Sequence, residues 1–246
     1  AVRFKYGTPN VAEATNVTLE LFDLLGLIGD LGAARESLTQ KYTRLANLGH
    51  DGRLYPTLSP SQATFERLIA VAESLRPSNV DTEYRYAPLW VPTSNKEYRG
   101  YAQRELDGTD ELGVSLAVFN NVTTNRDPML FGLNLPYDTE RAEEGETTQL
   151  DLIKLVTTQY GESNIRPSTH RDFLIWSIMD RIRKIPVSEQ ALAKGWMRIP
   201  TLGRKVLPGG GSVVGDVFSD GGQLRFAWND GRANDDSGVG FSVGEN

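Results

Sequence analysis

The sequence predicts an α+β protein with a mainly helical body, a smaller β portion and a glycine-hinged C-terminal arm. Three observations lead to this prediction. Apolar residues recur at helical spacing in several segments that end at glycine or proline. Prolines interrupt the middle of the chain, where only short strands are expected. Three consecutive glycines then precede a final segment that holds two short strand-like runs.

The first three helices are expected in the N-terminal part of the body. Their ranges are 11–25, 33–48 and 60–75. Thr8 and Pro9 precede the first range, and Gly49 follows the second. Ser59 with Pro60 opens the third range. These residue types are typical of helix ends. Because leucines and aromatic residues in each range recur at helical spacing, we interpret these stripes as core-facing.

Glycine recurs at positions 26, 29 and 32, between the first two expected helices. A glycine run can hold phosphate with its backbone N–H groups, but this one lacks the Gly-x-Gly-x-x-Gly spacing and no Gly-Lys-Ser/Thr follows it. We therefore interpret it as a break between helices, where glycine supplies a backbone conformation that other residues avoid.

A β-containing insertion is expected over residues 80–137, because four prolines exclude long helices there. Its predicted strands are Tyr84–Tyr86, Leu112–Phe119 and Met129–Leu135. The acidic stretch 138–151 follows and is interpreted as a solvated loop. Three more helices complete the body, at 148–160, 169–184 and 188–194. Thr169 and Asp172 form a variant of the capping box at the start of the second of these.

The predicted domains are a body over residues 1–206 and an arm over residues 207–246. Gly209–Gly211 forms the hinge between them. The arm is expected to contain strands at 224–228 and 239–243, paired around the turn residues 229–231. We expect the arm to pack partly on another chain, so that removal of 209–246 leaves a folded body that assembles poorly.

The expected core follows from the apolar stripes of the helices. It comprises Leu21, Phe22, Leu25, Phe65, Leu68, Ile69, Leu152, Leu155, Phe173, Trp176 and Ile178. With 246 residues, of which 39% are hydrophobic and 24% charged, the chain has enough apolar material for such a core.

Standard catalytic and metal-binding patterns are absent from the sequence. There is no cysteine, which excludes disulfides and thiolate metal sites. His170 and Asp172 with His50 could supply three ligands for iron, but the second histidine precedes the pair, and a histidine at a helix start is usually on the surface. No Gly-x-Ser-x-Gly elbow occurs. We assign no catalytic residue, metal or cofactor, and an enzyme whose site is invisible in the sequence remains an alternative.

Charge is strongly segregated along the chain. The net charge is −6, yet residues 166–205 hold nine basic and three acidic residues, a formal +6 that leaves −12 elsewhere. Aromatic residues interleave with the cations, as in grooves for single-stranded nucleic acid. The candidate contacts are Arg166, Arg171, Arg181, Arg183, Lys184 and Arg198. Arg181 and Lys184 are expected to share one helix face. Alternatively, these cations pair with the acidic stretch 138–151.

Residues 222–238 end in an oxygen-rich loop. The run Asn229-Asp230 followed by Asp235-Asp236-Ser237-Gly238 resembles the end of galactophilic bacterial lectin domains, whose loops help to hold calcium and sugar. The resemblance covers about 20 of the 246 residues and departs from the Asp-Asn-Ser-Gly form. It implies a calcium- or glycan-binding loop, with Asn234 as a further oxygen donor. A hairpin turn followed by a polar loop explains the same residues.

The leading hypothesis from the sequence is a self-assembling structural subunit, such as a viral coat or nucleocapsid-like protein. Its expected partners are other copies of the chain and single-stranded nucleic acid, with no membrane, because no window approaches 18 consecutive apolar residues. A coat subunit would reside in the virion. The binding loop and the invisible enzyme site are the two alternatives.

Overall fold

The computed structural model describes residues 8–49, 52–75, 103, 106–120, 165–185, 196–199, 205–206, 212–220, 223–230 and 237–244. The helices in these ranges are α1 (Val11–Leu24), α2 (Leu31–Ala46), α3 (Gln62–Ser74) and α7 (His170–Ile182). The strands are β1 (Arg53–Ser59), β2 (Glu111–Asn120), β3 (Ile165–Pro167), β4 (Trp196–Ile199), β5 (Lys205–Val206), β6 (Ser212–Asp220), β7 (Gln223–Asp230) and β8 (Ser237–Gly244).

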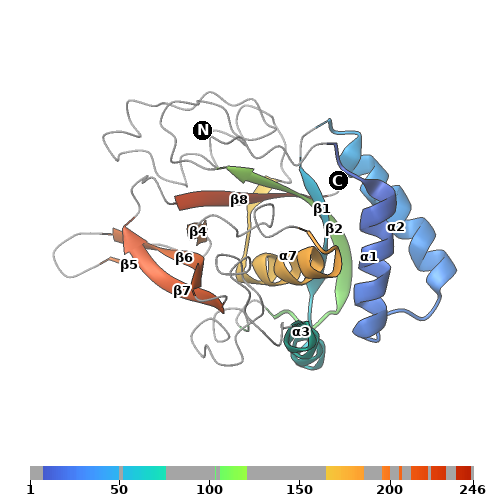
Figure 1. Ribbon diagram of the computed structural model, residues 1–246, viewed down its shortest axis with the longest axis horizontal. Helices are drawn as coiled ribbons and strands as arrows, with labels where there is room; N and C mark the ends of the chain where they lie inside the picture. The colour runs from blue at the N-terminus through green and yellow to red at the C-terminus, as the bar shows by residue number, and fades with distance from the viewer. Residues whose placement is uncertain are drawn as a thin grey trace.

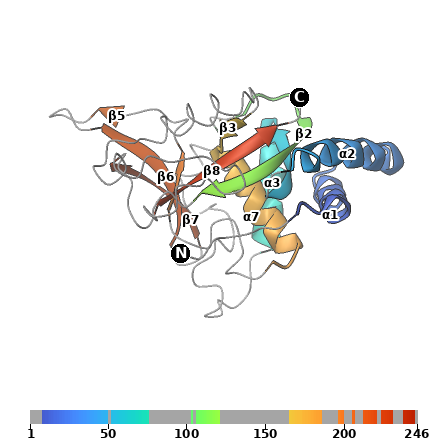
Figure 2. The ribbon, with the colours of Figure 1, turned by 90° about the horizontal axis from the view of Figure 1, so that it is seen from above.

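The predicted α+β class with a mainly helical body is confirmed. Within the described residues, the helices gather around the antiparallel strands β1, β2 and β8 (Figure 1). α1 and α2 lie to one side of β1 and β2, and α7 lies to the other side. The strands β5, β6 and β7 lie at the end of the molecule remote from α1 and α2, as the view from above shows (Figure 2).

The sheet runs in the order β1-β2-β8-β4-β6-β5, with β3 paired to β8 and β7 paired to β6. Its pairs are antiparallel except for β4 with β8, which are parallel. β1 therefore stands at one end of the described sheet. This place suits its sequence, because Pro56 cannot donate to a neighbouring strand and is tolerated at an edge.

Side-chain caps explain where the helices begin. The N-terminal caps are Asn10, Asp30, Ser61 and Thr169, and each side chain accepts a backbone N–H of its own helix. The capping box predicted from Thr169 and Asp172 is confirmed. Ser59, predicted as the cap of the third helix, is instead the last residue of β1, and Ser61 takes that role.

The interpretation of Gly26 as a helix break is confirmed. Its φ of 67° lies in the left-handed region. The N–H of Gly26 donates to Asp23 and that of Leu27 donates to Phe22, which is the double bond of a Schellman motif. A phosphate-holding loop is therefore not needed to explain this glycine.

The core lies between the helices and the β1–β2 part of the sheet. Nine predicted core residues are buried, and each is at most 4% exposed: Leu21, Phe22, Leu25, Phe65, Leu68, Ile69, Phe173, Trp176 and Ile178. Leu152 and Leu155 lie outside the described residues. Aromatic contacts extend this core, since the ring centre of Trp176 lies 5.4 Å from that of Tyr55 in a tilted arrangement and 5.0 Å from that of Phe173 in an edge-to-face arrangement.

One strand prediction needs correction, and one strand was missed. β7 does not form a hairpin with β8, because it pairs antiparallel with β6 from Val213 opposite Asp230 to Asp220 opposite Gln223. β1 was not expected at all. Pro56 at its centre argues against a strand when the segment is considered alone. In the tertiary structure, Leu54, Tyr55 and Leu58 are buried on the two faces of this strand.

The C-terminal strand belongs to the sheet of its own chain. β8 pairs with β2 over six residues and with β3 and β4 on its other side. Removal of 209–246 would therefore take out a central strand, and we no longer expect a folded body to remain. The hinge glycines 209–211 lie outside the described residues.

The remaining predictions concern segments that the structure does not describe. They are the strands at 84–86 and 129–135, the acidic stretch 138–151, and the helices at 148–160 and 188–194. Across the described part of the chain, no helix combines the length and the apolar character needed to cross a membrane.

Candidate functional site

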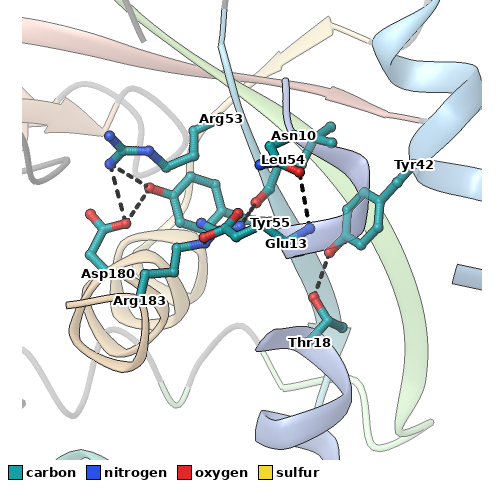
Figure 3. A network of polar contacts seen from close by, with 9 residues as sticks. All are labelled: Asn10, Glu13, Thr18, Tyr42, Arg53, Leu54, Tyr55, Asp180 and Arg183. Atoms are coloured by element: carbon teal, nitrogen blue, oxygen red, sulfur yellow. Dashed lines mark hydrogen bonds and ion pairs between the residues drawn. The ribbon is translucent and has the colours of Figure 1, made fainter. Parts of the chain in front are cut away.

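A buried polar network joins α7, β1 and α1 (Figure 3). Its centre is the hydroxyl of Tyr55, which donates to the Asp180 carboxylate at 2.6 Å. Both residues are 0% exposed. Arg53, two residues before Tyr55 on the same strand face, places its guanidinium 3.4 Å from the same carboxylate oxygen. The guanidinium of Arg53 and the hydroxyl of Tyr55 thus both help to compensate the buried charge of Asp180.

Burial changes the acidity of this centre. Desolvation, and then the negative charge of Asp180, raise the pKa of Tyr55 well above its ordinary value. The tyrosine therefore stays protonated and acts as a hydrogen-bond donor at any physiological pH. Such a group serves to anchor α7 to β1, and it is unsuited to act as a general base near neutral pH.

Arg183 extends the network from α7 to α1. The side chain of this C-cap residue is 1% exposed, and its Nε lies 2.8 Å from the carboxylate of Glu13. Its Nη2 donates to the backbone carbonyl of Leu54 on β1. The guanidinium carbon also lies 4.8 Å from the centre of the Tyr55 ring, as in a cation–π contact.

A second buried tyrosine links α1 to α2. The hydroxyls of Tyr42 and Thr18 are 2.7 Å apart, and both residues are 0% exposed. Burial raises the pKa of Tyr42 above its ordinary value, although the bond to Thr18 acts in the opposite direction. This contact fixes the α1–α2 pair without involving a charge.

The start of α7 carries its own ion pair. Arg166 donates to both carboxylate oxygens of Asp172, which also accepts the backbone N–H of Thr169. The next residue, His170, is 0% exposed, so the expectation that a histidine here lies on the surface is wrong. Within the described residues, no three histidine, aspartate or glutamate side chains gather into a potential metal site. His50 lies outside these residues.

The predicted nucleic-acid contacts occupy different environments. The side chain of Arg166 is 43% exposed although it is paired with Asp172, and Lys184 is exposed. Arg171 and Arg181 are partly buried. Arg183 is enclosed by Glu13, Leu54 and Tyr55, so it is not available to a phosphate in this conformation. Arg198 lies on β4, and its side chain is outside the described part of the structure.

Lys184 does not share a helix face with Arg181. α7 ends at Ile182, and Lys184 adopts a left-handed φ of 55°. Its N–H donates to Arg181 and that of Ile185 donates to Asp180, which closes the helix with a Schellman motif. The expected helix end at 184 was two residues too long, because the sequence has no glycine at this cap to mark it.

The turn between α1 and α2 exposes apolar surface that the sequence reading did not single out. Leu24 is 53% exposed and Leu31 is 56% exposed. Leu27 and Ile28, which lie between them, pack only partly against the core. We call residues 24–31 the leucine turn. Five of its eight residues are apolar, which was a signal in the sequence. Leu24 and Leu25 were assigned to a buried helix over 11–25, and Leu27, Ile28 and Leu31 fell between the first two predicted helices.

The structure describes the strands on either side of the oxygen-rich C-terminal loop. Asp230 ends β7 and Ser237 begins β8, while Asn234, Asp235 and Asp236 lie outside the described residues. Calcium or glycan binding there stays a prediction.

Comparisons of the whole chain with protein-family models, curated proteins and solved structures find no significant match.

Proposed function

We propose that this protein is a structural subunit that associates with copies of itself, as coat or nucleocapsid-like subunits do. The observation that supports this proposal is the leucine turn. Leu24 and Leu31 are each more than half exposed, and Leu27 and Ile28 between them are only partly buried. Large apolar side chains that are exposed within one short segment favour protein association there.

The leucine turn can contribute appreciable binding energy. Full burial of a leucine is worth about 1.5–3 kcal/mol, so covering the exposed half of Leu24 and of Leu31 supplies roughly 1–1.5 kcal/mol each. One such contact is weak. Repetition of the contact in a closed or helical assembly makes it effective, because every subunit then makes the contact twice.

Charge favours a contact between unlike surfaces of two copies. The exposed carboxylates of Glu20, Asp23 and Asp30 lie on or near the leucine turn. The segment 166–205 carries a formal +6 in the same chain. A turn of one copy seated near the basic segment of the next makes a heterologous contact, and contacts of this type generate rings or filaments.

The test compares three proteins by sedimentation velocity and electron microscopy over a range of concentrations. We expect wild type to form assemblies that weaken as salt rises. The double variant Leu24→Gln with Leu31→Gln should associate at least tenfold more weakly. The matched control is Leu48→Gln, which changes a leucine that is 42% exposed at the other end of α2 and should have no effect. A wild type that stays monomeric at high concentration would exclude the proposal.

Contact with single-stranded nucleic acid is the second candidate. It is supported by the exposure of Lys184 and the 43% exposure of Arg166 within the basic segment 166–205. Binding of this kind should weaken steeply as salt rises, because each phosphate contact releases counterions. The test is Arg181→Glu with Lys184→Glu, measured against single-stranded RNA at two salt concentrations. Equal binding by this variant and wild type would exclude the basic segment as the contact.

A further inference from the structure

The leucine turn joins two helices whose ends carry its exposed side chains. Leu24 is the last residue of α1 and is 53% exposed, and Leu31 is the first residue of α2 and is 56% exposed. The arrangement of these two side chains therefore depends on the backbone of residues 25–30, which connects the helices. A contact that a second copy recognises is stronger when this backbone already has one conformation in the free protein.

Local hydrogen bonds fix the first half of this connection. The N–H of Gly26 donates to the carbonyl of Asp23 at 2.9 Å, and the N–H of Leu27 donates to that of Phe22 at 2.9 Å. These are the two bonds of the Schellman motif, and they satisfy carbonyls of the last turn of α1. The carbonyl of the C-cap residue Leu25 is not satisfied by this motif, although Leu25 is 0% exposed. A carbonyl at such a position needs a donor from elsewhere in the fold.

Arg67 of α3 supplies that donor. Its Nη1 lies 2.8 Å from the carbonyl oxygen of Leu25, which is 42 positions earlier in the sequence. The same nitrogen lies 3.5 Å from the position that a Cβ on Gly26 would take, so the guanidinium lies against the left-handed residue of the turn. A cation is also favourable at the C-terminal end of a helix, where the helix dipole is negative. In Figure 1, α3 lies next to this end of α1.

We infer that Arg67 is the positioning residue of the leucine turn, because it ties the turn to α3 and so holds Leu24 and Leu31 in the arrangement that a second copy binds. The inference rests on the proposed self-association and adds the residue that sets the geometry of the contact. When the turn is held in one conformation, little entropy is lost as the two leucines are covered. A turn released from α3 samples several arrangements, and the fraction that matches the partner limits the affinity.

The first measurement separates the donor of Arg67 from its hydrocarbon stem. Arg67→Met keeps the stem and removes the donor, whereas Arg67→Lys keeps a charged donor. In sedimentation velocity, we expect Arg67→Met to associate roughly fivefold more weakly than wild type or worse, because the turn must be ordered at each contact. Arg67→Lys should restore most of the association. The matched control is Lys41→Met, which removes one positive charge from α2 ten residues after Leu31 and should associate as wild type does.

Hydrogen exchange examines the turn itself, at a concentration where the protein is unassociated. The amides of Gly26 and Leu27 donate the two bonds of the Schellman motif. In Arg67→Met, these two amides should exchange at least about fivefold faster than in wild type, while the amide of Tyr42 within α2 keeps its wild-type rate. A general loss of stability would instead accelerate all three. Unchanged exchange at Gly26 and Leu27 overturns the inference, whatever the association shows.

Gly26→Ala perturbs the turn without changing a charge. The added methyl group has room, since Arg67 Nη1 is 3.5 Å from it, and the strain comes from the left-handed φ of 67°. This variant should also associate more weakly than wild type. If Gly26→Ala and Arg67→Met associate as strongly as wild type while Leu24→Gln with Leu31→Gln does not, the inference fails and the proposed function stands. A wild type that stays monomeric excludes both, so the two failures are distinguished.

Discussion

Replacement of Tyr55 by phenylalanine tests whether the buried network stabilises the fold through a charged hydrogen bond. The ring remains, so its contact with Trp176 at 5.4 Å is preserved. The hydroxyl that lies 2.6 Å from the Asp180 carboxylate is lost. A hydrogen bond to a charged group contributes about 1.5–3 kcal/mol.

The carboxylate that remains makes the loss larger. Asp180 is 0% exposed, and the guanidinium of Arg53 remains 3.4 Å from its carboxylate in the variant. Incomplete compensation of a buried charge adds about 1 kcal/mol, so we expect Tyr55→Phe to lower the free energy of unfolding by roughly 2–4 kcal/mol.

The matched control is Tyr42→Phe. Tyr42 is equally buried, but its hydroxyl meets the neutral hydroxyl of Thr18 at 2.7 Å. The same chemical change should therefore cost only about 0.5–1.5 kcal/mol. Urea denaturation followed by tryptophan fluorescence gives both values. Equal losses for the two variants, or a loss below about 0.5 kcal/mol for Tyr55→Phe, would refute the assignment of a charged bond at the centre of the network.

Three further predictions concern other parts of the body. The described residues offer no hydrogen-bond partner to the buried hydroxyl of Ser115. Ser115→Ala should therefore leave the free energy of unfolding unchanged or raise it by up to about 1 kcal/mol. A loss above about 1 kcal/mol in urea denaturation would contradict this expectation. The backbone N–H of Ser61 donates to the Asp110 carboxylate and lowers its pKa in the folded protein. Asp110 therefore stabilises the fold above its unfolded pKa of about 4. This stabilisation is lost as the pH falls through the lower pKa of the folded state. Asp110→Asn should accordingly make the decline of stability below about pH 4 shallower in acid titrations, and an unchanged profile would argue against the contact. Leu68→Ala, at a position that is 0% exposed, should cost on the order of 2–5 kcal/mol in the same denaturation assay, whereas a loss under half a kcal/mol would place the α3 stripe at the surface.

The sequence alone predicted the helices and much of their core, because the signals that define a helix are short-range. Thr169 and Asp172 are three residues apart, and their capping box is found as predicted. The stripe that includes Phe65, Leu68 and Ile69 is buried for the same reason, since helical spacing places these residues on one face.

The pairing of strands was decided by contacts that are distant in the sequence. β1 lies nearly 60 positions before its partner β2, and β8 enters the same sheet from the other end of the chain. Neither pairing leaves a local signal. Pro56 even suggests a loop when the segment is read alone, and only its place at the edge of the sheet makes it compatible with a strand.

The same reason explains what the sequence missed at the candidate site. Arg183 reads as one more surface cation in a basic segment, and Tyr55 carries no motif. The structure brings them together across 128 positions, pairs the arginine with Glu13, and places Tyr55 and Arg53 beside Asp180. Local patterns determine which segments form helices. The environment of a charged side chain depends instead on which distant segments pack against it, and only the tertiary structure decides this.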